Sequence, residues 1–201
     1  MAGSPPIQLS EPQDIGDFLS EDEPAFDWLI PGLLERGDRL ILTGGEGKGK
    51  STFLRQIAFQ AASGIHPFSL EPIKPLKVLL VDLENSRQQT RRKLLELSEN
   101  RPAPVGMLKV AIWPIGLDLL YQGVKDAMGE KLSWMMPDLL VIGPTYKMAP
   151  RLDKEEESAQ LASILDTWRA TFGFGILMES HQPQAGIVEC KKHRPERPFG
   201  S

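Results

Sequence analysis

The chain has 201 residues, of which 41% are hydrophobic and 25% charged, and its formal net charge is −4. This length and composition predict a folded domain with a substantial core and exclude a wholly disordered chain. A single cysteine excludes an internal disulfide framework, and no apolar run approaches the roughly 20 residues that cross a bilayer. Because the first residues also lack a basic and apolar leader, we expect a cytoplasmic protein with no membrane contact.

Charge and proline content divide the chain into three segments. Residues 1–30 contain seven acidic side chains and no basic one, whereas the remainder is close to neutral. We therefore predict a flexible acidic arm over residues 1–25 and a folded core over residues 26–182. Residues 183–201 are predicted to form a basic, proline-containing tail at an incomplete domain end. Net charge alone does not favour nucleic-acid binding, so any such contact is expected from local loops.

Short apolar runs alternate with helical patterns along the core. Strands are predicted at residues 39–43, 77–82, 108–112, 138–142 and 174–178. Between them, helices are predicted at residues 51–63, at residues 86–99, from Asp118 through Leu132, and over the apolar stripe Leu161, Ile164, Leu165 and Trp168. This alternation predicts an α/β fold with a mainly parallel β-sheet and helices on both faces.

The first strand leads into a glycine-rich segment that matches the pattern G-x-x-x-x-G-K-[ST]. The residues predicted to bind nucleotide are Gly44, Gly45, Glu46, Gly47, Lys48, Gly49, Lys50, Ser51 and the following Thr52. Glycines allow backbone N–H groups to surround a phosphate, and the next helix adds the positive end of its dipole. Lys50 is placed to reach the β- and γ-phosphates of ATP, and the Ser51 hydroxyl is placed to bind Mg²⁺. The sequence therefore predicts ATP and Mg²⁺ as cofactors.

Acidic residues at the carboxyl ends of the next strands are candidates for the hydrolytic chemistry. Asp82 and Glu84 follow the second strand, at the sheet edge where α/β proteins bind their ligands. Glu84 is predicted to polarise the attacking water, and a helix cap is the alternative. The strand at residues 138–142 is followed by Gly143, where an acid that holds Mg²⁺ through water is expected. Asp138 does not replace that acid, because it begins the strand and is roughly 16 Å from the site.

Other polar residues follow the last two predicted strands. Thr145 and Tyr146 are interpreted either as polar contacts at the active edge or as ordinary loop residues. His181 is positioned to sense a γ-phosphate, with a surface histidine as the alternative. Cys190 and His193 form a C-x-x-H pair, which supplies too few ligands for a structural zinc site.

Taken together, these segments resemble the RecA-like P-loop ATPases, in particular the RepA-type hexameric helicase branch, whose relatives are often carried by phages and plasmids. The resemblance spans most of the chain and rests on residues 27–32, 39–51, 81–86, 138–144 and 179–181. It implies that Lys50 binds ATP together with Ser51 or Thr52, and that one of these hydroxyls binds Mg²⁺. It also implies that Glu84 activates water and that His181 reads the γ-phosphate.

The same resemblance implies partners. It implies a homo-oligomer, a hexameric ring, and contact with single-stranded nucleic acid through the loops at residues 145–157 and 182–198. In such rings a basic side chain reaches into the ATP site of the neighbouring subunit, and the candidates for it here are Arg194 and Arg197. Gly143 departs from the acid that is usual in the wider class.

Three functions are consistent with these features. The leading hypothesis is an ATP-hydrolysing motor or loader of helicase type that acts in nucleic-acid replication or recombination, which Glu84 and His181 favour. The alternative is a nucleotide-dependent switch with weak or no hydrolysis, which Gly143 favours. A small-molecule kinase needs a mobile basic lid, and residues 87–93 are better interpreted as a helix.

Overall fold

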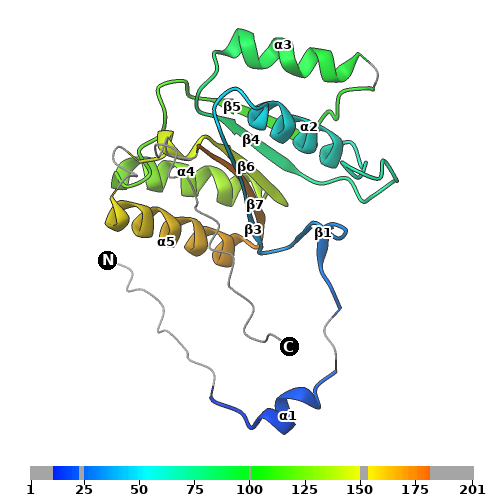
Figure 1. Ribbon diagram of the computed structural model, residues 1–201, viewed down its shortest axis with the longest axis vertical. Coiled ribbons are helices and arrows are strands. Elements are labelled where there is room, and N and C mark those ends of the chain that lie inside the picture. Colours follow the sequence, from blue (N-terminus) through cyan, green and yellow to red (C-terminus); the bar gives the residue numbers. More distant parts are fainter. Residues whose placement is uncertain (1–10, 23–24, 100, 150–153, 182–201) are drawn as a thin grey trace, which may run out of the picture.

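A five-stranded parallel sheet forms the centre of the molecule, with strand order β3-β7-β6-β4-β5 (Figure 1). The computed structural model describes residues 11–22, 25–99, 101–149 and 154–181. The strands are β3 (Arg39–Gly44), β4 (Val78–Asp82), β5 (Leu108–Ile112), β6 (Leu139–Gly143) and β7 (Gly175–His181). All four pairings are parallel, so the carboxyl ends of the strands meet at one edge. The predicted mainly parallel sheet is confirmed.

Helices cover both faces of this sheet (Figure 1). One face packs on α2 (Lys50–Ala62), with α3 (Arg87–Ser98) beside it, and the other packs on α4 (Gln122–Met135) and α5 (Glu155–Phe172). Strands β4 and β6 are buried at every position, because apolar side chains alternate between the two cores. The centre of the sheet therefore holds the carboxyl ends of β4, β6 and β7 in fixed positions.

A small antiparallel pair, β1 (Trp28–Ile30) and β2 (Leu34–Glu35), precedes the main sheet. Arg36 joins this pair to the body through ion pairs with Asp27 at 3.1 Å and Asp138 at 3.0 Å. The Asp138 carboxylate also accepts a hydrogen bond from the Lys77 backbone N–H at 2.9 Å. Asp138 therefore stabilises the start of β6, far from the carboxyl edge of the sheet.

One predicted helix start is wrong. The helix expected from Asp118 begins at Gln122, because the preceding residues bond to another loop. The backbone N–H groups of Leu117 and Leu119 donate to the carbonyls of Lys147 and Met148, and Leu119 is fully buried. Asp118 instead accepts a hydrogen bond from the Leu120 N–H within this turn.

The structure also contains two short helical segments that the sequence did not predict. Helix α1 (Ile15–Leu19) lies within the acidic segment, is capped by the Asp14 side chain, and has no buried residue. The 3₁₀ helix η1 (Thr145–Lys147) follows β6. Among the described residues, no helix is long and apolar enough to cross a membrane.

Candidate nucleotide-binding site

The glycine-rich loop connects β3 to α2 at the carboxyl edge of the sheet. Gly47 and Gly49 have φ values of 70° and 80°, a left-handed conformation that side chains disfavour. Gly49 caps α2, so the first N–H groups of this helix open toward the loop. The Lys50 ammonium donates to the Gly44 and Gly45 carbonyls, each at 2.8 Å, and thereby crosses the base of the loop.

A cleft of about 340 Å³ lies against this loop. Its walls contain most of the predicted nucleotide-binding residues, from Glu46 to Thr52, together with Glu84. Lys93 of α3 also lines the cleft, although its position in the sequence gave no sign of this. The structure therefore brings the glycine-rich loop, the first turn of α2 and Glu84 to one place.

Glu84 lies beyond β4 and is exposed, and its Oε1 accepts a hydrogen bond from the Tyr146 hydroxyl at 2.9 Å. Burial, this hydrogen bond and the nearby negative charges of Glu84, Glu46 and Glu179 raise the pKa of Tyr146 to about 12. The phenol consequently stays protonated at neutral pH and acts as the donor. Two residues predicted at the active edge are thus in direct contact.

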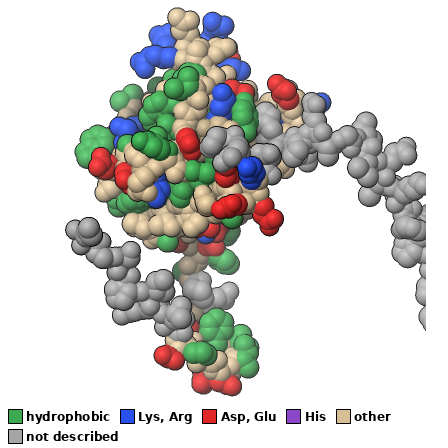
Figure 2. All heavy atoms as spheres, turned by 90° about the vertical axis from the view of Figure 1, so that its left-hand side faces the viewer, with side chains coloured by type: hydrophobic (Ala, Val, Ile, Leu, Met, Phe, Trp, Pro, Cys, Tyr) green, Lys and Arg blue, Asp and Glu red, His purple; other side chains and the backbone are tan. Residues whose placement is uncertain are grey.

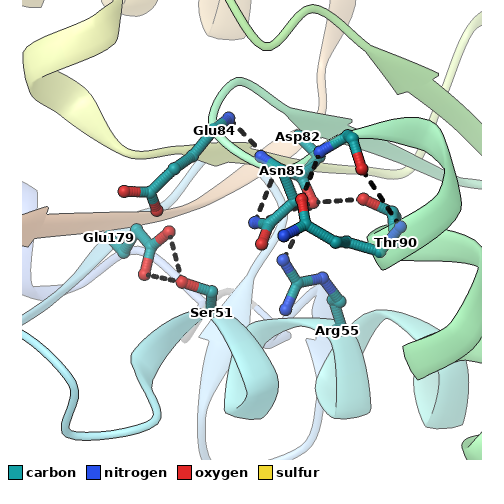
Figure 3. A network of polar contacts seen from close by, with 9 residues as sticks. Ser51, Arg55, Asp82, Glu84, Asn85, Thr90 and Glu179 are labelled. Carbon is teal, nitrogen blue, oxygen red and sulfur yellow. Dashed lines mark hydrogen bonds and ion pairs between the residues drawn. The ribbon is translucent and has the colours of Figure 1, made fainter.

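Asp82, the last residue of β4, is buried and lies within a network of polar contacts (Figure 3). It forms an ion pair with Arg55 at 2.8 Å and accepts from the Thr90 hydroxyl at 2.8 Å. It also accepts from the backbone N–H groups of Glu84 and Asn85. Burial acts to raise the pKa of Asp82, but the hydrogen bonds from Asn85, Arg55 and Thr90 outweigh it and lower that pKa. Asp82 therefore fixes the turn that carries Glu84.

A third acid, Glu179 of β7, contacts the first turn of α2. The Ser51 hydroxyl lies 2.9 Å from each carboxylate oxygen of Glu179, and Glu179 as a residue is only 4% exposed (Figure 3). Ser51 and Arg55 are four residues apart and share one face of α2, so this face meets both Glu179 and Asp82. The sequence reasoning did not single out Glu179, although a charged residue directly after an apolar strand was a possible signal.

Strand β6 ends at Gly143, which has no side chain that could contribute to the site. The Thr145 hydroxyl, just beyond, donates to the Ser180 hydroxyl at 3.1 Å. The backbone of His181 pairs with Gly44 at the end of the β3–β7 ladder, which places this residue at the same edge as the loop. Residues 150–153 and 182–201, including Cys190, His193, Arg194 and Arg197, lie outside the described residues.

A parallel sheet of this order, with a G-x-x-x-x-G-K-S loop between β3 and α2, defines a RecA-like P-loop ATPase. The model of the AAA domain family AAA_25 matches residues 4–186, and the chain belongs to that family. The predicted RecA-like fold is confirmed.

The fold is similar to a solved structure, that of the KaiC-like protein PH0186 from the hyperthermophilic archaeon Pyrococcus horikoshii OT3. The TM-score is 0.52 and the sequence identity 23%, over 80% of this chain and 68% of that one. A search of curated proteins found no match.

Proposed function

We propose that the chain binds ATP with Mg²⁺ in the cleft beside the glycine-rich loop, hydrolyses it, and acts as a helicase-type motor or loader in nucleic-acid replication or recombination. One observation carries this proposal: Lys50 and Ser51 at the start of α2 face the same cleft as Glu84. A phosphate-binding loop and an acid able to act on water therefore lie within reach of one nucleotide. The RepA-type branch is the member of the class that the sequence resembles.

The residues around the cleft fit a Mg²⁺ ion. Mg²⁺ prefers hard oxygen ligands and is usually bound by one or two carboxylates together with substrate phosphates. Ser51 and Glu179 supply such oxygens, 2.9 Å apart. Among the described residues there is no group of three metal-ligating side chains, which suits an ion held largely by a nucleotide. When bound, Mg²⁺ neutralises charge on the β- and γ-phosphates.

The side chains of this chain have separate roles in the proposed reaction. The loop N–H groups and the Lys50 ammonium bind and orient the phosphates. Glu84 accepts a hydrogen bond from the attacking water and takes up its proton, while the Tyr146 hydroxyl keeps the Glu84 carboxylate in position. His181, at the end of β7, reads the γ-phosphate and passes the signal to the segment that follows.

The proposed partners are single-stranded nucleic acid and further copies of this chain. The nucleic acid contacts the loops at residues 145–157 and 182–198, and Arg194 or Arg197 reaches a neighbouring site within a hexameric ring. Exposed apolar side chains on α1 support self-association: Ile15, Phe18 and Leu19 are 66%, 57% and 74% exposed. Apolar side chains gathered on one short helix favour contact with another protein surface.

A nucleotide-dependent switch with weak hydrolysis is the second candidate function. It is favoured by Gly143, which leaves β6 without the acid that P-loop ATPases place there. ATP turnover by the full chain, measured with and without single-stranded DNA, separates the two functions. We expect turnover that DNA stimulates, and a Glu84→Gln variant that binds ATP equally well but turns it over at least about 100-fold more slowly. ATP binding without turnover would favour the switch, and no ATP binding would contradict both.

A further inference from the structure

We propose that Glu179 of β7 supplies the Mg²⁺-binding carboxylate that β6 lacks. This inference rests on the proposed function, since it concerns the metal that accompanies the nucleotide. P-loop ATPases bind Mg²⁺ through the hydroxyl of the loop and an acid at the end of a neighbouring strand. In this protein the proposed acid is on β7 instead of β6. Strand β7 is one strand closer to the glycine-rich loop, because it lies between β6 and β3 in the sheet.

The packing of Gly143 against Glu179 supports the replacement of an acid on β6 by one on β7. A Cβ atom built on Gly143 would lie 2.6 Å from Glu179 Cγ, closer than real Cβ atoms approach, and 3.3 Å from the Glu179 backbone nitrogen. Gly143 is not one of the glycines with positive φ, so its backbone conformation does not require glycine. The Glu179 side chain therefore occupies the space that an acid on Gly143 would need. Gly143 on β6 therefore leaves room for the Glu179 side chain on β7, and the two residues depend on one another.

The register of the sheet explains how an acid on β7 can take the place of an acid on β6. Ile142 pairs with Met178, so Gly143 and Glu179 lie next to one another, one residue further along the two strands. Both follow fully apolar strand segments, and both lie at the carboxyl edge. A glutamate side chain from β7 therefore reaches the same region that a shorter acid on β6 would occupy.

The contact with Ser51 gives the carboxylate its proposed role. The hydroxyl has a single proton to donate, and its oxygen lies 2.9 Å from each Glu179 carboxylate oxygen. Donating that proton leaves the lone pairs of the Ser51 oxygen available to a cation. Only a small space of about 20 Å³ remains between Ser51, Glu179, Gly143 and the Arg55–Asp82 pair, so the carboxylate is held in place.

The test separates metal binding from simple hydrogen bonding to Ser51. Affinity of the full chain for a fluorescent ATP analogue is measured with Mg²⁺ and with EDTA in its place. We expect wild type to bind more tightly with Mg²⁺, and Glu179→Gln to keep its affinity in EDTA but lose at least about 10-fold of the Mg²⁺-dependent gain. The size of this loss follows from removing one charged ligand contact.

Glu96→Gln is the control, because it makes the same change to an exposed glutamate of α3 that does not line the cleft, and it is expected to keep the Mg²⁺-dependent gain. Three outcomes contradict the proposal in distinguishable ways. If Glu179→Gln keeps the full gain, the inference is wrong and the proposed function stands. If wild type binds nucleotide but gains no affinity from Mg²⁺, the inference is wrong and the proposed Mg²⁺ binding fails with it, whereas ATP binding stands. If wild type binds no nucleotide in either buffer, the proposed function is wrong and the inference fails with it.

Moving the acid back to β6 provides an independent check. The double variant Gly143→Asp with Glu179→Ala removes the side chain that blocks Gly143 and places a carboxylate on β6. We expect it to recover part of the Mg²⁺-dependent gain, whereas Gly143→Ala with Glu179→Ala recovers none. Equal behaviour of the two double variants, with both folded by circular dichroism, would show that the carboxylate has no role in metal binding.

Discussion

The Lys50 side chain is the main positive charge within the glycine-rich loop, and it is only 7% exposed. We predict that Lys50→Ala lowers ATP affinity about 10- to 100-fold, since a hydrogen bond to a charged group contributes roughly 1.5–3 kcal/mol. The fold should persist, because within the described part of the chain the ammonium donates only to the Gly44 and Gly45 backbone carbonyls. Lys74→Ala, at an exposed position that does not line the cleft, is the control and should bind nearly normally. Equal affinity of a folded Lys50→Ala protein would contradict the assignment of the loop.

The contact between Tyr146 and Glu84 predicts an unusual titration. Ultraviolet absorbance against pH should show Tyr146 ionising near pH 12. Glu84→Gln removes a negative charge that opposes the phenolate, and the pKa of Tyr146 should therefore fall toward the ordinary tyrosine value of 10.0. Tyr146→Phe identifies the transition by removing it. A titration that Glu84→Gln leaves unchanged would mean that the two side chains do not meet in solution.

At the scale of elements, the Arg55–Asp82 pair joins α2, β4 and α3 through a buried network. We predict that Asp82→Asn lowers the free energy of unfolding by about 3 kcal/mol, because it leaves the buried Arg55 charge without its partner. Thr90→Val, which removes one hydrogen bond, should cost only about 1 kcal/mol. Chemical denaturation at neutral pH measures both values. Equal stability of wild type and Asp82→Asn would show that the pair is not a major support of the fold.

The same network has a definite pH dependence. The pKa of Asp82 is lower in the folded protein than the ordinary aspartate value of 3.8, so this carboxylate stabilises the fold above that value. The contribution is lost as pH falls below 3.8 and through the folded-state pKa. Asp82→Asn should therefore remove part of the acid sensitivity of wild type in that range.

Local patterns predicted most elements, and contacts between distant segments account for the rest. The buried strands and the glycine-rich loop depend on short stretches of sequence, and the structure contains them at nearly the predicted bounds. The start of α4 was predicted wrongly because Leu117 and Leu119 bond to residues 147–148 rather than to the helix. The Glu179–Ser51 contact was not predictable, since it joins positions 128 residues apart. The role proposed for Glu179 also depends on Gly143, which lies on a third segment of the sequence.

At the scale of the whole molecule, α1 presents apolar and acidic side chains at one end, and basic side chains gather at the opposite end, where α3 lies (Figure 2). If α1 mediates self-association, changing both Ile15 and Phe18 to Ser should lower the molar mass measured by light scattering on a sizing column. Phe68→Ser is the control, because Phe68 is likewise 57% exposed but lies elsewhere. An unchanged mass for the α1 variant would exclude this helix from the contact between copies.

Nucleic-acid binding by the full chain should depend on the basic residues near its end. Lys191, Lys192, Arg194 and Arg197 lie within seven positions, outside the described residues, whereas the net charge of the whole chain is −4. Four phosphate contacts on single-stranded DNA predict a slope of about −3 for the logarithm of affinity against the logarithm of salt concentration. A ring would raise the effective affinity by displaying several copies of the segment, without any new contact.

Replacing these four residues with Gln in the full chain should flatten that slope and weaken binding at low salt. The matched control changes the exposed Arg87, Arg91 and Arg92 of α3 to Gln, which removes a similar charge from another basic cluster. Because net charge alone contributes little at physiological salt, the α3 variant should retain most of the wild-type slope. If the α3 variant loses binding and the other retains it, the nucleic acid contacts α3. If neither variant nor wild type binds single-stranded DNA at low salt with ATP present, the motor hypothesis loses its principal support and the nucleotide-dependent switch is favoured.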